Sequence, residues 1–280
     1  MTDAISPVPS DARAAERNGW RPGSYSLDEL AAALLAGRVA GPETSHDRRN
    51  VGWKIERLVT GDPDLQFGLR DLGRFSAQEV LDMMAEEAGF DADTALIEGP
   101  TAIDPYRVLR ACEAAGRRLA NAAARAEGVL LATGHPAGLP LLYQGVGALL
   151  EDAGARLLRP LSGARWREGT HHRQIRYLNG VAVLSDHAST LHTHSPAAME
   201  RMLAEVRPDL VFADHGFAGA AIQAGIDTIS IVDVNDPAPV VAKWQGRTDV
   251  VIVMDDNVLP EDYWPCFQAI ASQFKGLPLG

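Results

Sequence analysis

Short apolar runs alternate with helical segments over the second half of the chain. Residues 129–132, 210–213, 228–232 and 250–254 have the length and composition of buried strands, and helical patterns separate them. A weaker strand is expected at residues 156–159. Because strands that alternate with helices form parallel sheets, we predict an α/β fold with a doubly wound, mostly parallel sheet.

One segment interrupts this alternation. Residues 175–178 and 181–184 are apolar and flank Asn179 and Gly180, the strongest short-range signal for a tight hairpin turn. We therefore predict a β-hairpin inserted into the α/β part of the chain.

The first half of the chain carries helical signals. Ser26 with Glu29 and Ser76 with Glu79 have the form of capping boxes, which mark helix starts. Further helices are expected at residues 47–59 and 104–127, and the second of these is expected to end at Gly128. The predicted organisation is a disordered lead at 1–23, a helical region at 24–128 and an α/β catalytic domain at 129–280.

Composition excludes several classes of protein. The formal net charge of -11 argues against nucleic acid as a partner, because such binding depends on Lys and Arg that neutralise phosphates. No apolar run has the roughly 18 residues that a membrane span needs, and the N-terminus lacks the apolar core of a signal peptide. Two cysteines are too few for a disulfide framework. We expect a cytoplasmic protein without a membrane partner, and a homodimer is left open.

Polar motifs follow the predicted strands. Open α/β sheets bind ligands beyond the carboxyl ends of their strands, so these motifs are expected to share one site. The motifs lie at residues 133–135, 186–187, 192–194, 214–216, 233–236 and 255–257.

Several of these residues suit phosphate or metal chemistry. His135 follows a strand and precedes a helix, where an anion could bind, although a loop histidine bonded to backbone explains the same pattern. His192 and His194 would point to the same side of an extended chain and could share a metal or a phosphate, unless the loop is only an exposed polar one. Asp214 or Asp233, taken singly, is more often a structural cap. The oxygen-rich motif at 255–257 suits Mg²⁺ or Mn²⁺.

The sequence lacks the motifs of several large enzyme classes. No Gly-x-Gly-x-x-Gly or Walker loop is present, which counts against enzymes of dinucleotides or ATP. No Gly-x-Ser-x-Gly elbow is present, which counts against a serine hydrolase.

From about Leu30 onward the chain resembles a largely actinobacterial family called simply Phosphatase. The resemblance implies hydrolysis of a phosphomonoester. A fainter similarity of plan links the chain to metal-dependent carbohydrate phosphatases with a helical N-terminal region, in which Asp233, Asn235 and Asp255 would be metal ligands. The segments that carry the family resemblance are residues 61–63 with 67–69, 132–136, 192–196, 213–216, 235–237 and 255–256.

The preferred hypothesis is a metal-assisted phosphatase of a small phosphorylated metabolite, a sugar or nucleoside phosphate, with Mg²⁺ or Mn²⁺ as cofactor. Catalysis is assigned to His135, Asp214 and His215. The expected metal ligands are Asp233, Asn235, Asp236 and Asp255. The expected substrate contacts are Arg48, Asn50, Thr133, Gly134, Tyr143, His192, His194 and Gly216.

Two alternatives remain at this stage. The chain has Tyr143 where the family is expected to carry a histidine, which motivates a lyase, isomerase or transferase of a biosynthetic pathway on the same scaffold. The other alternative is a ligand-binding protein without enzymatic activity, in which the polar groups at the strand ends are mostly caps.

Overall fold

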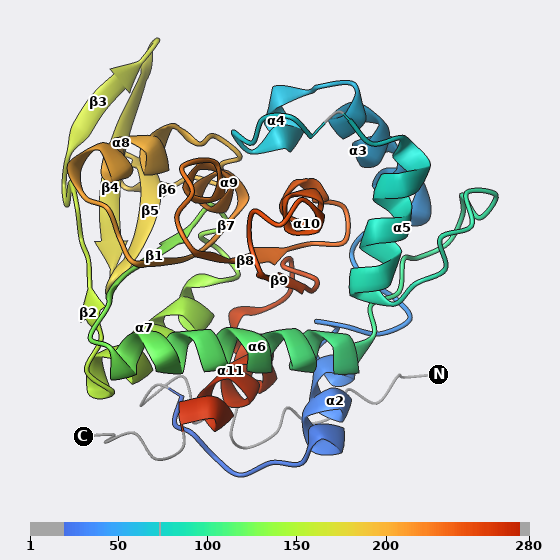
Figure 1. The fold of residues 1–280 in the computed structure, drawn as a ribbon, viewed down its shortest axis with the longest axis horizontal. Coiled ribbons are helices and arrows are strands. Elements are labelled where there is room, and N and C mark those ends of the chain that lie inside the picture. Colours follow the sequence, from blue (N-terminus) through green and yellow to red (C-terminus); the bar gives the residue numbers. More distant parts are fainter. Residues whose placement is uncertain (1–19, 73, 275–280) are drawn as a thin grey trace.

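The computed structural model describes residues 20–72 and 74–274 (Figure 1). The predicted disordered lead at 1–23 falls largely outside these residues. Residues 20–23, however, pack against the helix α11 (Trp264–Ala271). The ring of Trp20 lies 5.6 Å from that of Phe267, and the amide of Gly23 donates a hydrogen bond of 2.8 Å to Gln268. These four residues of the predicted lead therefore contact α11, which offers both an aromatic surface and a polar partner.

The described residues form one mixed sheet of nine strands, in the order β3-β4-β5-β1-β7-β8-β9, with β2 paired to β1 and β6 paired to β5. Strands β5, β1, β7, β8 and β9 run parallel to one another, which confirms the predicted α/β fold. The strands are β1 (Gly128–Thr133), β2 (Arg156–Leu157), β3 (Arg165–Glu168), β4 (His171–Leu178), β5 (Val181–Asp186), β6 (Ser189–Thr190), β7 (Leu210–Asp214), β8 (Thr228–Val232) and β9 (Val250–Val253).

Helices cover both faces of the sheet, as Figure 1 shows. Alternate residues of one strand point to opposite faces, so Leu131 packs into the core under α6, α7 and α11, whereas Leu130 packs under α8 and α9. The helices are α2 (Leu27–Ala36), α3 (Arg48–Val59), α4 (Pro63–Gln66), α5 (Ala77–Ala88), α6 (Pro105–Ala124), α7 (Pro140–Asp152), α8 (Ala197–Glu205), α9 (His215–Gln223), α10 (Ala238–Trp244) and α11, with 3₁₀ turns at Pro260–Tyr263 and Ser272–Phe274.

The helix predictions hold for most of the first half. Both capping boxes form at the starts of α2 and α5. The helix predicted at 104–127 ends earlier, at Ala124, because Ala126 adopts a φ of 51° and Gly128 already belongs to β1. The C-terminal segment 260–274 is an α-helix with a 3₁₀ turn at each end.

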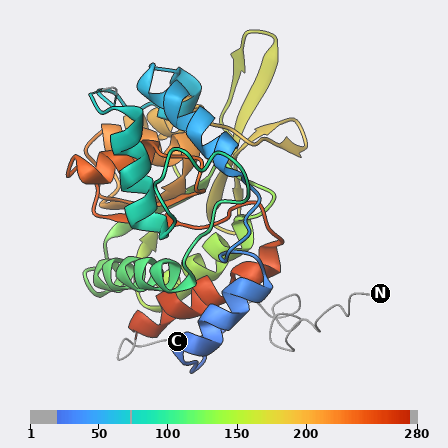
Figure 2. The same ribbon diagram turned by 90° about the vertical axis from the view of Figure 1, so that its right-hand side faces the viewer.

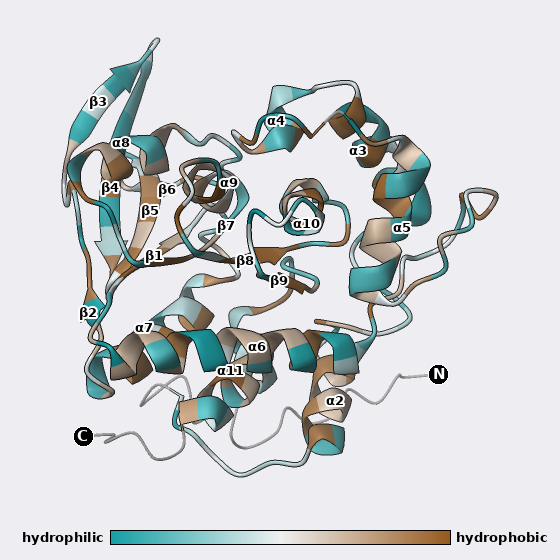
Figure 3. Ribbon diagram, in the orientation of Figure 1, coloured by the Kyte–Doolittle hydropathy of each residue, from teal (hydrophilic) through white to brown (hydrophobic). Residues whose placement is uncertain are grey.

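The predicted hairpin is present, but its role differs from the prediction. Asn179 and Gly180 adopt φ values of 47° and 93°, as a two-residue hairpin turn requires. Strand β5 is a member of the parallel sheet beside β1, so only β4 and the unpredicted β3 form an added antiparallel ribbon. The ribbon projects from the body of the molecule (Figure 2), and β3 is hydrophilic, unlike the inner strands (Figure 3).

Helix α9 consists mainly of small residues because other backbone segments lie against it. A Cβ atom at Gly216 would collide with the carbonyl groups of His194 and Ser195, and one at Gly219 would collide with the carbonyl oxygen of Phe67. These contacts bring the loop before α8 and the loop after α4 to the start of α9. The two glycines therefore determine which segments meet at the carboxyl ends of the strands.

We predict that Gly219→Ala lowers the free energy of unfolding by about 1–3 kcal/mol, the usual cost of overpacking. Gly52→Ala in α3 is the matched control, because a Cβ there meets nothing within 4 Å. The control should keep or slightly raise stability, since alanine favours helix over glycine. Denaturant unfolding of both variants measures the difference, and equal stability of the two would contradict the packing argument.

Candidate active site

Polar side chains gather at the carboxyl ends of the parallel strands, as predicted. Strand β1 lies between β5 and β7, so the chain connections on its two sides run in opposite directions. Doubly wound sheets bind ligands at such a point, beyond the carboxyl ends of the strands. The loop before α8 joins this edge, because the amide of Thr193 donates a 2.9 Å hydrogen bond to the carbonyl oxygen of Gly134.

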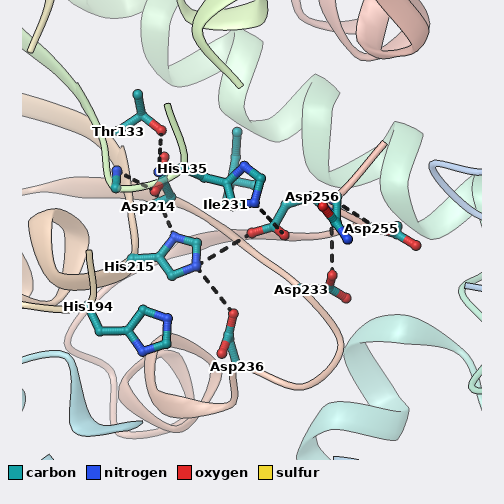
Figure 4. A network of polar contacts seen from close by, with 12 residues as sticks. Thr133, His135, His194, Asp214, His215, Ile231, Asp233, Asp236, Asp255 and Asp256 are labelled. Carbon is teal, nitrogen blue, oxygen red and sulfur yellow. Dashed lines mark hydrogen bonds and ion pairs between the residues drawn. The ribbon is translucent and has the colours of Figure 1, made fainter. Parts of the chain in front are cut away.

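The centre of the site is a buried pair, Asp214 and His215 (Figure 4). One oxygen of Asp214 accepts hydrogen bonds from the amide of Gly134 at 2.7 Å and from Nδ1 of His215 at 2.8 Å. Burial would raise the pKa of Asp214, but its hydrogen bonds with His215 and the Thr133 hydroxyl hold it below its usual value. Asp214 is therefore a carboxylate, and it fixes the orientation of the imidazole.

His215 presents its other nitrogen to two more carboxylates. Nε2 lies 3.5 Å from Asp236 and 3.7 Å from Asp256. Burial would lower the pKa of His215, but Asp214, Asp256 and Asp236 outweigh burial and raise that pKa to about 10. The backbone of His215 has a φ of 46°, an uncommon conformation outside glycine and one that often marks functional sites.

Three further histidines surround His215. The rings of His192, His194 and His135 lie 4.9, 5.1 and 5.9 Å from the ring of His215. Burial and the positive charge of His215 lower the pKa of His194, and the same causes lower the pKa of His192 to about 4. Burial also lowers the pKa of His135. All three imidazoles are thus neutral near pH 7 and have nitrogen lone pairs to offer.

Among the residues that the structure describes, two overlapping groups of side chains are close enough to hold a metal ion. The first group is His192, His194 and His215, and the second is His215, Asp236 and Asp256; within each group the ligand atoms lie within 4.8 Å of one another. Burial and the neighbouring Asp233 raise the pKa of Asp256 well above its ordinary value. One oxygen of Asp256 has no hydrogen-bond partner among the described residues. The neutral imidazoles of His192 and His194 beside a buried carboxyl group with an unpartnered oxygen fit a divalent cation.

The structure brings only part of the predicted metal set into these groups. Asp236 belongs to one of them, whereas Asp233, Asn235 and Asp255 face the segment 45–54, which contains the start of α3. Four pairs join this segment to the strand ends, and one of them includes Asp236. The pairs are Ser45 with Asp255 at 2.6 Å, His46 with Asp233 at 3.3 Å, Asn50 with Asn235 at 2.7 Å and Lys54 with Asp236 at 3.5 Å.

The predicted substrate contacts also divide. Thr133, His192, His194 and Asn50 lie at the strand-end edge, and Gly134 and Gly216 allow close backbone approach there. Tyr143 is fully buried against Phe212, with its hydroxyl near Asp214, so it lies behind the site. Arg48 donates a 2.9 Å hydrogen bond to the carbonyl oxygen of Asp91, and its side chain forms no hydrogen bond or ion pair with the described site residues named above.

Three residues of the site were not among the predicted site residues. Asp256 lies inside the predicted motif at 255–257, so the strand-end argument could have included it. His46 and Lys54 carry no sequence signal, because only tertiary packing brings α3 to the carboxyl ends of the strands.

The raised pKa of His215 predicts a pH dependence of stability in the metal-free protein. A histidine whose pKa is higher in the folded than in the unfolded state stabilises the folded protein. For His215 this contribution is complete below about pH 6.5 and is lost as the pH rises through about 10. The difference in unfolding free energy between the wild type and His215→Gln should therefore shrink from pH 6.5 to pH 10. Denaturant titrations of chelator-treated protein measure it, and a difference that is constant or grows with pH would contradict the ion pairs.

Comparison with known proteins now bears on this site. The profile of the family called Phosphatase matches residues 25–275, a range that contains every residue of the site. Phosphatase SCO2771 of Streptomyces coelicolor is 36% identical over 263 residues, which are 91% of this chain and 98% of that protein. Both names support phosphatase activity, which is a hydrolase activity. The resemblance inferred from the motifs is confirmed, and the chain belongs to the Phosphatase family.

Proposed function

We propose that the protein is a metal-assisted phosphomonoesterase that acts on a small phosphorylated metabolite. The observation that carries this proposal is the arrangement of His215, whose Nδ1 is bonded to Asp214 while Nε2 is directed toward Asp236 and Asp256. Histidines that bind metals commonly have a carboxylate on the other ring nitrogen, which fixes the tautomer.

The residues that would hold the metal are His192, His194, His215, Asp236 and Asp256. When bound, a divalent ion supplies charge neutralisation at the phosphoryl oxygens. Imidazole nitrogen suits Mn²⁺ or Zn²⁺ better than Mg²⁺, so Mn²⁺ is the favoured member of the pair expected from sequence.

Two other side chains have the chemistry to assist the reaction. Lys54 extends from α3 to within 3.5 Å of Asp236, with 17% of its side chain exposed, and its ammonium would pair with a phosphoryl oxygen. His135 is neutral near pH 7, and its buried Nδ1 has no hydrogen-bond partner in the described chain. His135 would take a proton from the attacking water as the new P–O bond forms, and would return it to the leaving oxygen as the ester bond breaks.

The position of Tyr143 gives no support to the non-hydrolytic alternative. This residue motivated that reading because a histidine was expected in its place. Its ring lies 4.6 Å from that of Phe212 and is part of the hydrophobic core.

Removal of the metal should abolish hydrolysis of p-nitrophenyl phosphate. Chelator-treated protein should regain activity with Mn²⁺ or Zn²⁺ and less with Mg²⁺, because the donor set is rich in nitrogen. Phosphate release, measured together with metal content, checks this expectation. Full activity in protein shown to contain no metal would contradict it.

Asp214→Asn should weaken metal binding by about 10–100-fold, because the amide cannot hold His215 in the same tautomer as well as a carboxylate does. Asp209→Asn is the matched control: Asp209 lies at the opposite end of β7 and accepts a 2.7 Å hydrogen bond from the amide of Gly128. Isothermal titration with Mn²⁺ gives both affinities. Equal affinities in the two variants would remove Asp214 from its proposed role.

A further inference from the structure

We propose that the cavity beside His192 binds the polyhydroxylated part of the substrate, so that the enzyme prefers sugar phosphates to nucleotides. This inference rests on the proposed phosphatase function and assigns a substrate class to it. The cavity has a volume of about 300 Å³ and lies between the ribbon strand β4, the end of β5 and the loop before α8. That volume matches the small end of the range for small-molecule sites.

The cavity adjoins the proposed phosphoryl site directly. His192 lines the cavity, and its ring is also 4.9 Å from those of both His135 and His215. Thr193, the next residue, lines the cavity and is bonded to Gly134 at the end of β1. A phosphoryl group among the histidines would therefore have its organic part within reach of the cavity.

One wall of the cavity is a guanidinium held between two carboxylates. Nε of Arg173 donates to Glu168 at 2.9 Å, and Nη1 lies 3.6 Å from Asp186. The hydrogen bonds of Arg173 to the described residues use Nε and Nη1, which leaves the Nη2 hydrogens to donate to a ligand. The fixed guanidinium thus offers donors, and the carboxylates beside it offer acceptors for hydroxyl groups.

The rest of the lining combines apolar and hydroxyl groups. Leu184 and Leu191 supply an apolar surface. The hydroxyl of Thr193 accepts a 3.1 Å hydrogen bond from the amide of Ser195, and the hydroxyl of Ser195 accepts one of 3.3 Å from the amide of Ala197. The hydrogens of both hydroxyl groups therefore remain available to donate to a ligand. Donors and acceptors beside an apolar surface suit a sugar, which has hydroxyl groups and C–H faces.

The same lining does not suit a nucleotide. Nucleobases are usually held by stacking on large aromatic side chains, and the described lining contains no Phe, Tyr or Trp. The two carboxylates also oppose a second phosphate group, since they would repel it.

The experiment compares kcat/KM of the metal-loaded enzyme on glucose 6-phosphate, ribose 5-phosphate, adenosine monophosphate and p-nitrophenyl phosphate. The wild type should prefer the two sugar phosphates to the nucleotide. Arg173→Gln should lower kcat/KM for the sugar phosphates by about tenfold or more, as expected when a charged donor is lost, while p-nitrophenyl phosphate is unaffected. Arg167→Gln is the matched control, because Arg167 is exposed on β3 of the same ribbon and does not line the cavity.

A second variant, Glu168→Gln, tests the acceptor side of the same wall and should give the same selective loss. Three results would overturn the proposal. The wild type could prefer the nucleotide, both variants could lose kcat/KM equally on all four substrates, or neither variant could lose any. If the wild type hydrolyses no phosphate ester, the proposed function fails instead. Titration calorimetry with glucose 6-phosphate then still tests the cavity. The proposal requires that Arg173→Gln bind this ligand more weakly than both the wild type and Arg167→Gln.

Discussion

The hydrogen bond between the Asp214 carboxylate and Nδ1 of His215 is the contact on which the rest of the site depends. A carboxylate that is fully buried at the end of β7 is costly unless donors surround it, and the amide of Gly134, the Thr133 hydroxyl and the imidazole supply them. This contact ties the end of β1 to the start of α9. It also directs Nε2 of His215 toward Asp236 and Asp256, where we propose that a cation binds.

The N-terminal helical region completes the site by supplying partners for the remaining acids. Segment 45–54 meets the ends of β8 and β9 through four polar pairs, each with a different strand-end residue. Clustered buried carboxylates repel one another, so without these partners the edge of the sheet would be strongly destabilised. The same segment brings Lys54 beside Asp236, where a phosphate would need positive charge. One face of α3 therefore pairs with the strand-end residues and also presents Lys54 to the proposed phosphate position.

The sequence predicted the sheet and the edge that carries the site, because both follow from short-range patterns. Apolar runs marked the buried strands, Ser26 and Ser76 marked helix starts, and polar residues followed the strand ends. Short-range patterns do not tell which of two neighbouring carboxylates faces the histidines. Asp255 pairs with Ser45 while the adjacent Asp256 lies near His215, since neighbouring residues of an extended chain point in opposite directions.

Long-range packing accounts for the other differences. Tyr143 follows the family segment 132–136 closely in sequence, yet its place on α7 buries it under the sheet against Phe212. The ribbon strand β3 is polar and short, and only its pairing with β4 identifies it as a strand. His46 and Lys54 reach the site through the docking of α3, which no local pattern specifies.

We propose that imidazole and carboxylate groups around His215 bind one divalent ion together. X-ray absorption spectroscopy of Zn²⁺-loaded protein tests this most directly, because imidazole rings give a characteristic multiple-scattering signal. The expected coordination shell is mixed, with histidine nitrogens at about 2.0–2.1 Å and carboxylate oxygens at about 2.0–2.2 Å. A shell made only of oxygen, without an imidazole signal, would contradict it.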